Sequence, residues 1–276
     1  MTLKKTLTIA GSDTSAGAGM QADLKTFQEH NTYGMVALTT IVSMDPKTWS
    51  HRVDPLPLEV LDKQIETALS INPDAIKTGM LGVREIIERA GKAYLDSSAK
   101  HFVVDPVMVC KGEDEVLNPD SVDAMNELLL PHATVVTPNL FEAGQLASMS
   151  PLKSIDDMKI AAQKIYDHGA KHVVIKGGKA FEDSHAIDLY YDGNTFYKLM
   201  TPKFETSYNH GAGCTFAASV TANLANGKQP MEAIKDAKAF VASAIKNGWK
   251  MNDFVGPVNH GAYHNIEKIK VEVEEV

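Results

Sequence analysis

The most informative stretch of this chain is Asn209-His210-Gly211-Ala212-Gly213-Cys214-Thr215, and residues 216–226 after it have the pattern of a helix. Its two glycines allow a backbone turn in which the N–H groups of Gly211, Ala212 and Gly213 point at one spot. The N-terminus of the following helix adds partial positive charge there. Such a turn can stabilise a phosphoryl group during its transfer. On this motif alone, an ordinary glycine turn that caps a helix is an equal alternative.

Cys214 lies in the first turn of that expected helix. A helix N-terminus lowers the pKa of a thiol, and the resulting thiolate can take the proton of a substrate hydroxyl or polarise it. The alternative is a small side chain that fills space beside an anion site. The sequence therefore predicts a catalytic role for Cys214 and leaves the structural role open.

Outside this stretch, short apolar segments rich in β-branched residues alternate with segments of helical periodicity. Strands are expected at residues 7–10, 35–43, 74–78, 102–105, 134–137 and 173–176. Helices are expected at residues 21–29, 58–70, 85–96, 155–168, 214–226 and 230–248, and residues 124–130 are expected to end a further helix. A hairpin is expected over residues 188–197. This alternation predicts an α/β protein with a three-layer α/β/α fold around a mostly parallel central sheet. No linker or repeat interrupts the pattern, so one domain over residues 1–276 is expected.

Composition narrows the class of protein. The 276 residues are 44% hydrophobic, which suffices for a sizeable core, and the net charge of −8 makes nucleic acid a poor partner. Residues 1–10 lack the pattern of a signal peptide, and no apolar run approaches the roughly 20 residues of a spanning helix. We therefore expect a cytoplasmic protein with no membrane partner. The two cysteines, Cys110 and Cys214, exclude a disulfide framework and are not spaced for zinc.

Glycine and polar turns follow five of the expected strands. They are Gly11-Ser12-Asp13, Lys77-Thr78-Gly79-Met80, Asp105-Pro106-Val107, Thr137-Pro138-Asn139 and Lys176-Gly177-Gly178. Ligands of parallel sheets bind at the carboxyl ends of the strands. The sequence therefore predicts one cleft to which all five turns contribute.

Asn139 and Glu142 are three residues apart at a strand-to-helix junction, which puts both side chains on one face of the first helical turn. A carboxylate and an amide can hold Mg²⁺ near phosphates, whereas helix capping by the same residues is the alternative. Lys176-Gly177-Gly178-Lys179 suits triphosphate binding, although it lacks the GK[ST] ending of a Walker A motif. Asp23 can hydrogen-bond a substrate hydroxyl, or it can be a first-turn acid favoured by the helix dipole.

Taken together, these segments resemble the ribokinase superfamily, and more narrowly its vitamin-kinase branch of hydroxymethylpyrimidine phosphate kinases and pyridoxal kinases. The segments that carry the resemblance begin at Thr8, end at Thr215 and follow the family's order. The resemblance implies MgATP as the phosphoryl donor, a small vitamin as the acceptor and a homodimer, and it leaves a monovalent cation open. Elsewhere in the superfamily an aspartate base ends the glycine turn, whereas this branch often has cysteine there, so Cys214 marks the branch.

The resemblance also implies a role for each site residue. The nucleotide would contact Asn139, Lys176, Gly177, Gly178, Lys179, Ala180, Asp188, Gly213 and Ala225. The acceptor pocket would be lined by Gly11, Ser12, Asp23, Met44, His51, Met80 and Val107. Glu142 would hold Mg²⁺, and catalysis would depend on Cys214 and the N–H groups of the glycine turn, residues 211–213.

Residues 110–115 resemble the lid of the family, and their first residue is Cys110. Lid closure would exclude water and so prevent wasteful ATP hydrolysis. We hypothesise that Cys110 approaches the acceptor when the lid closes and adds reversibly to an aldehyde as a hemithioacetal. A lid cysteine without a role is the alternative.

Met44 departs from the pattern of the pyrimidine-phosphorylating relatives, which typically have Gln or Glu at this place to pair with an aminopyrimidine. A thioether sulfur is only a weak acceptor, and a site that loses such a pairing should reject the pyrimidine. The predicted acceptor is therefore pyridoxal, pyridoxine or pyridoxamine, which makes the chain a kinase for vitamin B6. His51 can contact the acceptor or lie in a surface loop. A hydroxymethylpyrimidine (phosphate) kinase is the alternative enzyme, and a vitamer-binding protein without catalysis is the alternative from another class.

Overall fold

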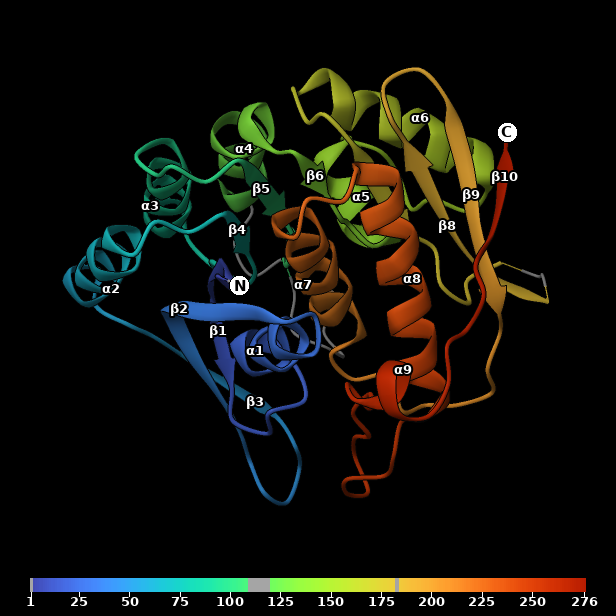
Figure 1. Ribbon diagram of the computed structural model, residues 1–276, viewed down its shortest axis with the longest axis horizontal. Coiled ribbons are helices and arrows are strands. Elements are labelled where there is room, and N and C mark those ends of the chain that lie inside the picture. Colours follow the sequence, from blue (N-terminus) through green and yellow to red (C-terminus); the bar gives the residue numbers. More distant parts are fainter. Residues whose placement is uncertain (1, 109–119, 182–183) are drawn as a thin grey trace.

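The structure is a computed structural model that describes residues 2–108, 120–181 and 184–276. Across these residues the strands form one sheet in the order β10-β9-β8-β7-β6-β5-β4-β1-β2-β3 (Figure 1). Strands β7, β6, β5, β4, β1 and β2 pair in parallel, while β3 at one edge and β8 to β10 at the other are antiparallel. The bounds are β1 (Lys4–Asp13), β2 (Thr32–Met44), β3 (His51–Pro55), β4 (Ala75–Thr78), β5 (His101–Val104), β6 (Val135–Val136), β7 (Val173–Lys176), β8 (His185–Tyr191), β9 (Phe196–Pro202) and β10 (Glu272–Glu275).

Helices cover both faces of this sheet (Figure 1). Helices α2 to α6 pack against one face, whereas α1, α7 and α8 pack against the other. The predicted three-layer α/β/α fold with a mostly parallel sheet is confirmed. The bounds are α1 (Gly19–Glu29), α2 (Leu58–Ser70), α3 (Arg84–Leu95), α4 (Asp120–Leu128), α5 (Leu140–Leu146), α6 (Ile155–Asp167), α7 (Ala212–Ala225), α8 (Pro230–Lys246) and α9 (Ala262–Asn265), with a 3₁₀ helix at Leu130–His132.

The side chains of the central strands alternate between two apolar layers, as the two-residue period of a strand requires. In β5, Phe102 and Val104 join the cluster beneath α2 to α6, and Val103 joins the cluster beneath α7 and α8. All three are fully buried. Because burial of each such side chain contributes roughly 1.5–3 kcal/mol, both faces of the strand stabilise the sheet. This is why the central strands appear in the sequence as continuous apolar runs.

The predicted and observed boundaries agree best in the interior of the chain. Helix α2 and strand β7 begin and end at the predicted residues, 58–70 and 173–176. Strands β3 and β10 are absent from the sequence prediction, because exposed and charged segments such as Glu272–Glu275 lack the apolar alternation of a strand. The single domain expected over residues 1–276 stays a prediction, which the continuity of the described sheet favours.

Helix α7 begins two residues earlier than predicted, at Ala212 rather than Cys214. Its N-cap is Gly211 with a φ of +83°, a left-handed conformation that favours glycine. No side chain caps the first turn of α7, and the same is true of α1. At the start of α7 the Ala212 N–H donates to the oxygen of Asn209 at 3.2 Å, but no side-chain oxygen of the described residues accepts the first N–H groups of either helix.

Candidate active site

A pocket of about 550 Å³ lies at the carboxyl ends of the parallel strands. Each of the five predicted turns contributes residues to its wall, so the prediction of one shared cleft is confirmed. The predicted site residues that it brings together are Gly11, Ser12, Met44, His51, Met80, Val107, Asn139, Glu142, Lys176, Gly178, Lys179, Asp188, Gly211, Ala212, Gly213 and Cys214.

Two glycine loops interlock in the wall of this pocket. A Cβ on Gly211 would lie 1.8 Å from the carbonyl oxygen of Gly17, and a Cβ on Gly17 would lie 2.3 Å from the ring of His210. Gly19 begins α1 with a φ of +58°, and a Cβ there would lie 2.6 Å from the oxygen of Gly11. Because only glycine fits these places, the loop after β1 and the turn before α7 are held together as one unit.

The uncapped N-termini of α1 and α7 both line the pocket. The Nζ of Lys176 lies 3.4 Å from the place that a Cβ on Gly213 would occupy, so the ammonium group lies close to the first turn of α7. Partial positive charge from the helix and the full charge of the lysine therefore converge on one spot. This arrangement suits an anion such as a phosphate group.

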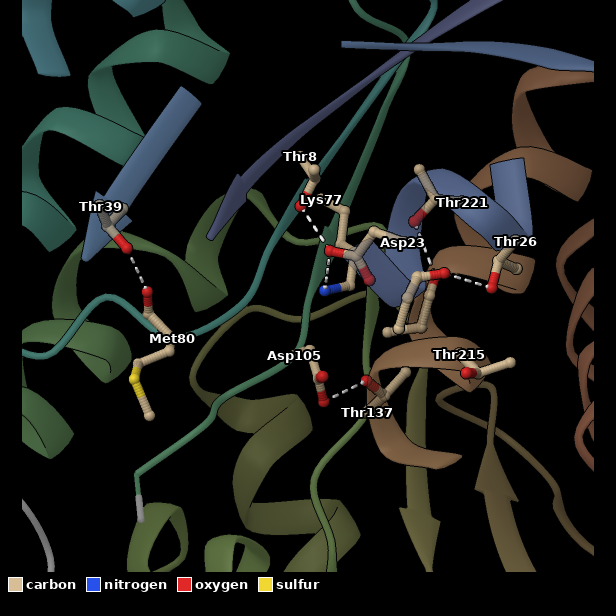
Figure 2. Close-up of polar contacts among 12 residues, drawn as sticks. Thr8, Asp23, Thr26, Thr39, Lys77, Met80, Asp105, Thr137, Thr215 and Thr221 are labelled. Atoms are coloured by element: carbon tan, nitrogen blue, oxygen red, sulfur yellow. Dashed lines mark hydrogen bonds and ion pairs between the residues drawn. The ribbon is translucent and has the colours of Figure 1, made fainter. Parts of the chain in front are cut away.

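Lys176, at the end of β7, pairs with the buried Asp105, and 2.9 Å separate Nζ and Oδ1. Thr137 donates a hydrogen bond to the same carboxylate oxygen at 3.2 Å (Figure 2). The lysine lines the pocket and keeps 16% of its side chain exposed. Burial by itself would lower the pKa of Lys176, but the carboxylates of Asp105 and Glu142 raise it. The ammonium group is therefore charged and accessible.

Asn139 and Glu142 form a capping box at the N-terminus of α5. The Glu142 N–H donates to Asn139 Oδ1 at 2.9 Å, and the Asn139 N–H donates to Glu142 Oε2 at 2.8 Å. The capping alternative is confirmed, and both residues also line the pocket. Burial raises the pKa of Glu142 to about 7, although Lys176 acts to lower it. A carboxylate in this place fits the oxygen preference of Mg²⁺, and its role as a magnesium ligand stays a prediction.

Cys214 is the third residue of α7 and lines the pocket. The prediction that its thiol has a lowered pKa is wrong. Burial raises the pKa of Cys214 to about 12; Lys77 and the Gly19 N–H act to lower it, whereas Asp23 and Asp105 raise it further. The thiol is therefore neutral near pH 7, because the loss of water around it outweighs the helix dipole.

Asp23 does not line the pocket, so its contact with the acceptor stays a prediction that this geometry does not support. Its side chain is fully buried and pairs with Lys77 at 3.0 Å, while Thr8 donates a hydrogen bond to it at 2.7 Å (Figure 2). Nor is it a first-turn acid, because α1 already begins at Gly19. Burial by itself would lower the pKa of Lys77, but the Asp23 carboxylate raises it. The pair is an internal ion pair that ties α1 to β4.

Three further predicted residues lie away from the pocket wall. Ala225 is the last residue of α7, at the opposite end of the helix from the glycine turn, and its contact with the nucleotide stays a prediction. Gly177 is buried against β8, where a Cβ would lie 2.4 Å from the oxygen of Ile187. Ala180 is exposed on the loop after β7. Since neither Gly177 nor Ala180 lines the pocket, only part of the predicted nucleotide loop does.

Asp188 lines the pocket from β8 and pairs with Lys238 of α8, with 2.8 Å between Oδ2 and Nζ. Its other oxygen accepts the Gly178 N–H at 3.3 Å. The pair therefore fastens the loop after β7 to α8. Lys238 also lines the pocket, and the sequence analysis missed it because no local pattern separates it from the other lysines of its helix.

His210 and Asp13 form another pair that the sequence analysis missed, with 2.7 Å between Nε2 and Oδ2. Asp13 also accepts the N–H groups of Ser15 and Ala18, each at 2.8 Å. Burial by itself would raise the pKa of Asp13, but the hydrogen bonds from His210, Ser15 and Ala18 lower it to about 2. A charged carboxylate thus holds the loop after β1 against the turn before α7. Both residues stand in motifs singled out from the sequence, but nothing local indicates that they meet.

The β2–β3 hairpin supplies another part of the wall. Met44 and His51 are the last register pair of β2 and β3, and both line the pocket. The surface-loop alternative for His51 is wrong, since this residue begins β3. Met80 lines the pocket too, and its carbonyl oxygen accepts a hydrogen bond from Thr39 at 2.7 Å (Figure 2). The thioether side chains of Met44 and Met80 give this part of the pocket wall an apolar character.

The predicted lid, residues 110–115 with Cys110, lies outside the described residues. Its closure over the pocket and the hemithioacetal at Cys110 stay predictions. Among the helices that the structure describes, none is both long and apolar enough to cross a membrane.

Comparisons with known proteins agree with this geometry. Residues 13–259 match the family model for phosphomethylpyrimidine kinase. Pyridoxine kinase of Bacillus subtilis (strain 168) is 52% identical over 264 residues, which cover 95% of this chain and 97% of that one. The pyridoxal kinase from Staphylococcus aureus in complex with ADP matches with a TM-score of 0.97 and 71% identity over 100% of both chains. The same kinase in complex with AMP-PCP and pyridoxal matches with a TM-score of 0.96 and 70% identity, again over 100% of both chains. The chain therefore belongs to the phosphomethylpyrimidine kinase family.

Proposed function

We propose that this chain is an ATP-dependent kinase for the 5'-hydroxymethyl group of pyridoxal, pyridoxine or pyridoxamine. The observation that carries the proposal is the first turn of α7, which no side chain caps and which has Lys176 beside Gly213. This turn lines the same pocket as Met44 and His51. In the sheet, β7 and β8 lie on one side of β1, and β2 and β3 lie on the other. Donor and acceptor would thus enter one pocket from different sides of the glycine turn. The Staphylococcus aureus pyridoxal kinase, solved with AMP-PCP and pyridoxal, supports both ligands.

Catalysis in this pocket would consist mainly of positioning and charge stabilisation. The N–H groups of the glycine turn and the ammonium group of Lys176 would stabilise the charge on the transferred phosphoryl group. Glu142 would hold Mg²⁺, which neutralises phosphate charge when it is bound. The neutral thiol of Cys214 would orient the acceptor hydroxyl by hydrogen bonding and would not be a preformed thiolate base.

Substrate choice is the direct test of this function. The purified protein is assayed with MgATP and either pyridoxal or hydroxymethylpyrimidine, and we expect a higher kcat/KM for pyridoxal. Met44→Gln should shift the ratio of the two values toward the pyrimidine by roughly tenfold or more, because it restores a hydrogen-bonding partner. A wild-type preference for the pyrimidine would contradict the argument from Met44. Absence of turnover on both would leave a vitamer-binding protein without catalysis.

We further propose a magnesium requirement and a homodimer, both of which the family resemblance supports. Chelation of divalent cations should abolish turnover, and added Mg²⁺ should restore it. Sedimentation should give twice the mass of the chain, and the mass of a single chain would refute the dimer.

A further inference from the structure

We infer that Trp49 and Phe254 form an aromatic clasp that positions the acceptor side of the pocket, an inference that rests on the proposed kinase function. Their ring centroids are 5.8 Å apart and the rings are inclined by 10°, so the pair is stacked. Trp49 belongs to the turn between β2 and β3, and Phe254 belongs to the loop between α8 and α9. In Figure 1 these loops lie at the same edge of the molecule, below the β3 and α9 labels. The clasp therefore joins two segments that are far apart in the sequence.

On one side, the clasp holds the end of the β2–β3 hairpin. Met44 and His51 are its last register pair, and both line the pocket. The turn beyond them is closed by a hydrogen bond from the Trp49 N–H to the oxygen of Asp45 at 2.9 Å and by one from the Asp45 N–H to the oxygen of Ser50 at 3.0 Å. Strand β3 is the last strand of the sheet, with β2 as its one neighbour among the described strands. A contact at the turn therefore has a strong influence on where this hairpin end lies.

On the other side, the loop of Phe254 is fastened to the glycine turn before α7. The His210 N–H donates to the oxygen of Gly256 at 3.1 Å, and the Val258 N–H donates to the oxygen of His210 at 3.2 Å. Within the loop, the Phe254 N–H donates to Asn252 Oδ1 at 2.9 Å. The clasp thus connects the wall that carries Met44 and His51 to the turn that faces the phosphoryl group.

The backbone conformation of Trp49 indicates that this position has tryptophan because of the contact that its ring makes. Its φ is +60°, in the left-handed region that bulky residues rarely adopt. Gly or Asn would fit this turn with less strain. The indole contacts Phe254 instead, a residue that remains 53% exposed. Turn geometry alone does not favour tryptophan here, whereas the stacked contact accounts for it.

Neither ring lines the pocket, so both are positioning residues that act through Met44 and His51. Loss of the stack should loosen the acceptor wall and leave the nucleotide side intact. Such a change raises the KM of the acceptor and has little effect on kcat or on the KM of ATP.

Trp49→Asn is the sharpest test, because asparagine tolerates the left-handed backbone and cannot stack. We expect the KM of pyridoxal to rise about three- to tenfold, with kcat and the KM of ATP within about twofold of wild type. Trp49→Phe should restore most of the affinity. Phe254→Ala should reproduce the effect of Trp49→Asn, and the double variant should add little to it. The matched control is Trp249→Phe, in the same loop as Phe254 and 52% exposed, which should match wild type.

An unchanged KM of pyridoxal in both Trp49→Asn and Phe254→Ala overturns the inference, and so does an equal loss of ATP affinity. Tryptophan emission, measured without ligand, tests the clasp independently of the proposed function. The chain has two tryptophans, so Trp249→Phe leaves Trp49 as the single emitter. Phe254→Ala in that background should shift the emission, and an unshifted spectrum would refute the stack. If the wild-type protein phosphorylates no vitamer, the proposed function fails while the emission still decides whether the clasp exists.

Discussion

Two lysine–aspartate pairs lie in the same sheet region, and they differ in how far their side chains are exposed, although Lys77 and Lys176 both line the pocket. Lys77 and Asp23 are both 0% exposed, whereas Lys176 is 16% exposed beside Asp105 at 2%. The N···O distances are nearly equal, at 3.0 Å and 2.9 Å. The sealed pair, Lys77–Asp23, joins α1 to the sheet, and the open pair, Lys176–Asp105, borders the glycine turn. Burial, more than contact geometry, therefore decides whether such charges stabilise the fold or bind a ligand.

The two carboxylates are also supported differently. Thr8 donates to Asp23 at 2.7 Å, and Thr137 donates to Asp105 at 3.2 Å. Asp23 Oδ1 has no hydrogen-bond partner within the described ranges. Asp23 therefore depends on Lys77 and Thr8, because a buried acceptor without a partner is costly.

The largest effect should come from breaking the sealed pair. Lys77→Met leaves the Asp23 carboxylate buried without its counter-charge, which should cost about 3–5 kcal/mol of the free energy of unfolding. Urea denaturation measures this loss. The double variant Lys77→Met with Asp23→Leu should recover part of it, since no charge then remains. A loss below about 1 kcal/mol in the single variant would show that the pair is not sealed.

Breaking the open pair should impair activity more than stability. Lys176→Met removes the ammonium group beside Gly213, and kcat/KM for ATP should fall about 10²- to 10³-fold. The control is Lys171→Met, an exposed lysine before the same strand, which should have little effect. If Lys176→Met unfolded the protein as readily as Lys77→Met and left turnover intact, the distinction between the pairs would be lost.

Several of these features could be predicted from the sequence because their signals are local. The order of strands and helices follows from periodicity, and the turns at the strand ends share one cleft because parallel strands end at one edge. Lys176 and the glycine turn are among the features that have such local signals. The partner of Asp23 could not be found in this way, since Lys77 is 54 residues distant and an acid early in a helix has the same pattern whether sealed or accessible.

Cys214 shows a second limit of local rules. Its place in the first turn of α7 correctly indicates a helix dipole, but burial raises its pKa to about 12, and Asp23 and Asp105, which are distant in the sequence, raise it further. The stack of Trp49 on Phe254 is likewise invisible in the sequence, because both rings stand in loops without periodicity.

A smaller effect concerns pH and involves Glu142, whose pKa the open pair influences. Burial raises the pKa of Glu142 from 4.5 to about 7, so its carboxylate is charged above that pH. The apparent affinity for Mg²⁺ should therefore fall about tenfold between pH 8 and pH 6. Because the folded state binds this proton more tightly, the contribution to stability is present below pH 4.5 and is lost as the pH rises through about 7. Titration of turnover with Mg²⁺ at each pH measures the change in affinity. An affinity for Mg²⁺ that does not change with pH would contradict the assignment of Glu142 as ligand. Glu142→Gln should remove the pH dependence of both the affinity and the stability.

The smallest effect compares the two threonines. Thr8→Val deletes a hydrogen bond to a carboxylate that is fully sealed, whereas Thr137→Val deletes a longer one beside the pocket. Thr8→Val should lower the free energy of unfolding by about 1 kcal/mol more than Thr137→Val does. Urea denaturation of the two variants side by side gives this difference, and equal losses would show that both carboxylates lie in equivalent surroundings.

The interlocked glycine loops have a consequence for the order in which the protein is made. His210 follows Asp13 by 197 residues, so at about 5–20 residues per second the ribosome delivers the second loop roughly 10–40 s after the first. Until then Phe27 lacks part of its cover, since Ala218 and Ala222 of α7 pack against it. The nascent chain thus leaves part of this apolar surface uncovered for most of its synthesis, and such exposed surface favours aggregation until α7 has been made.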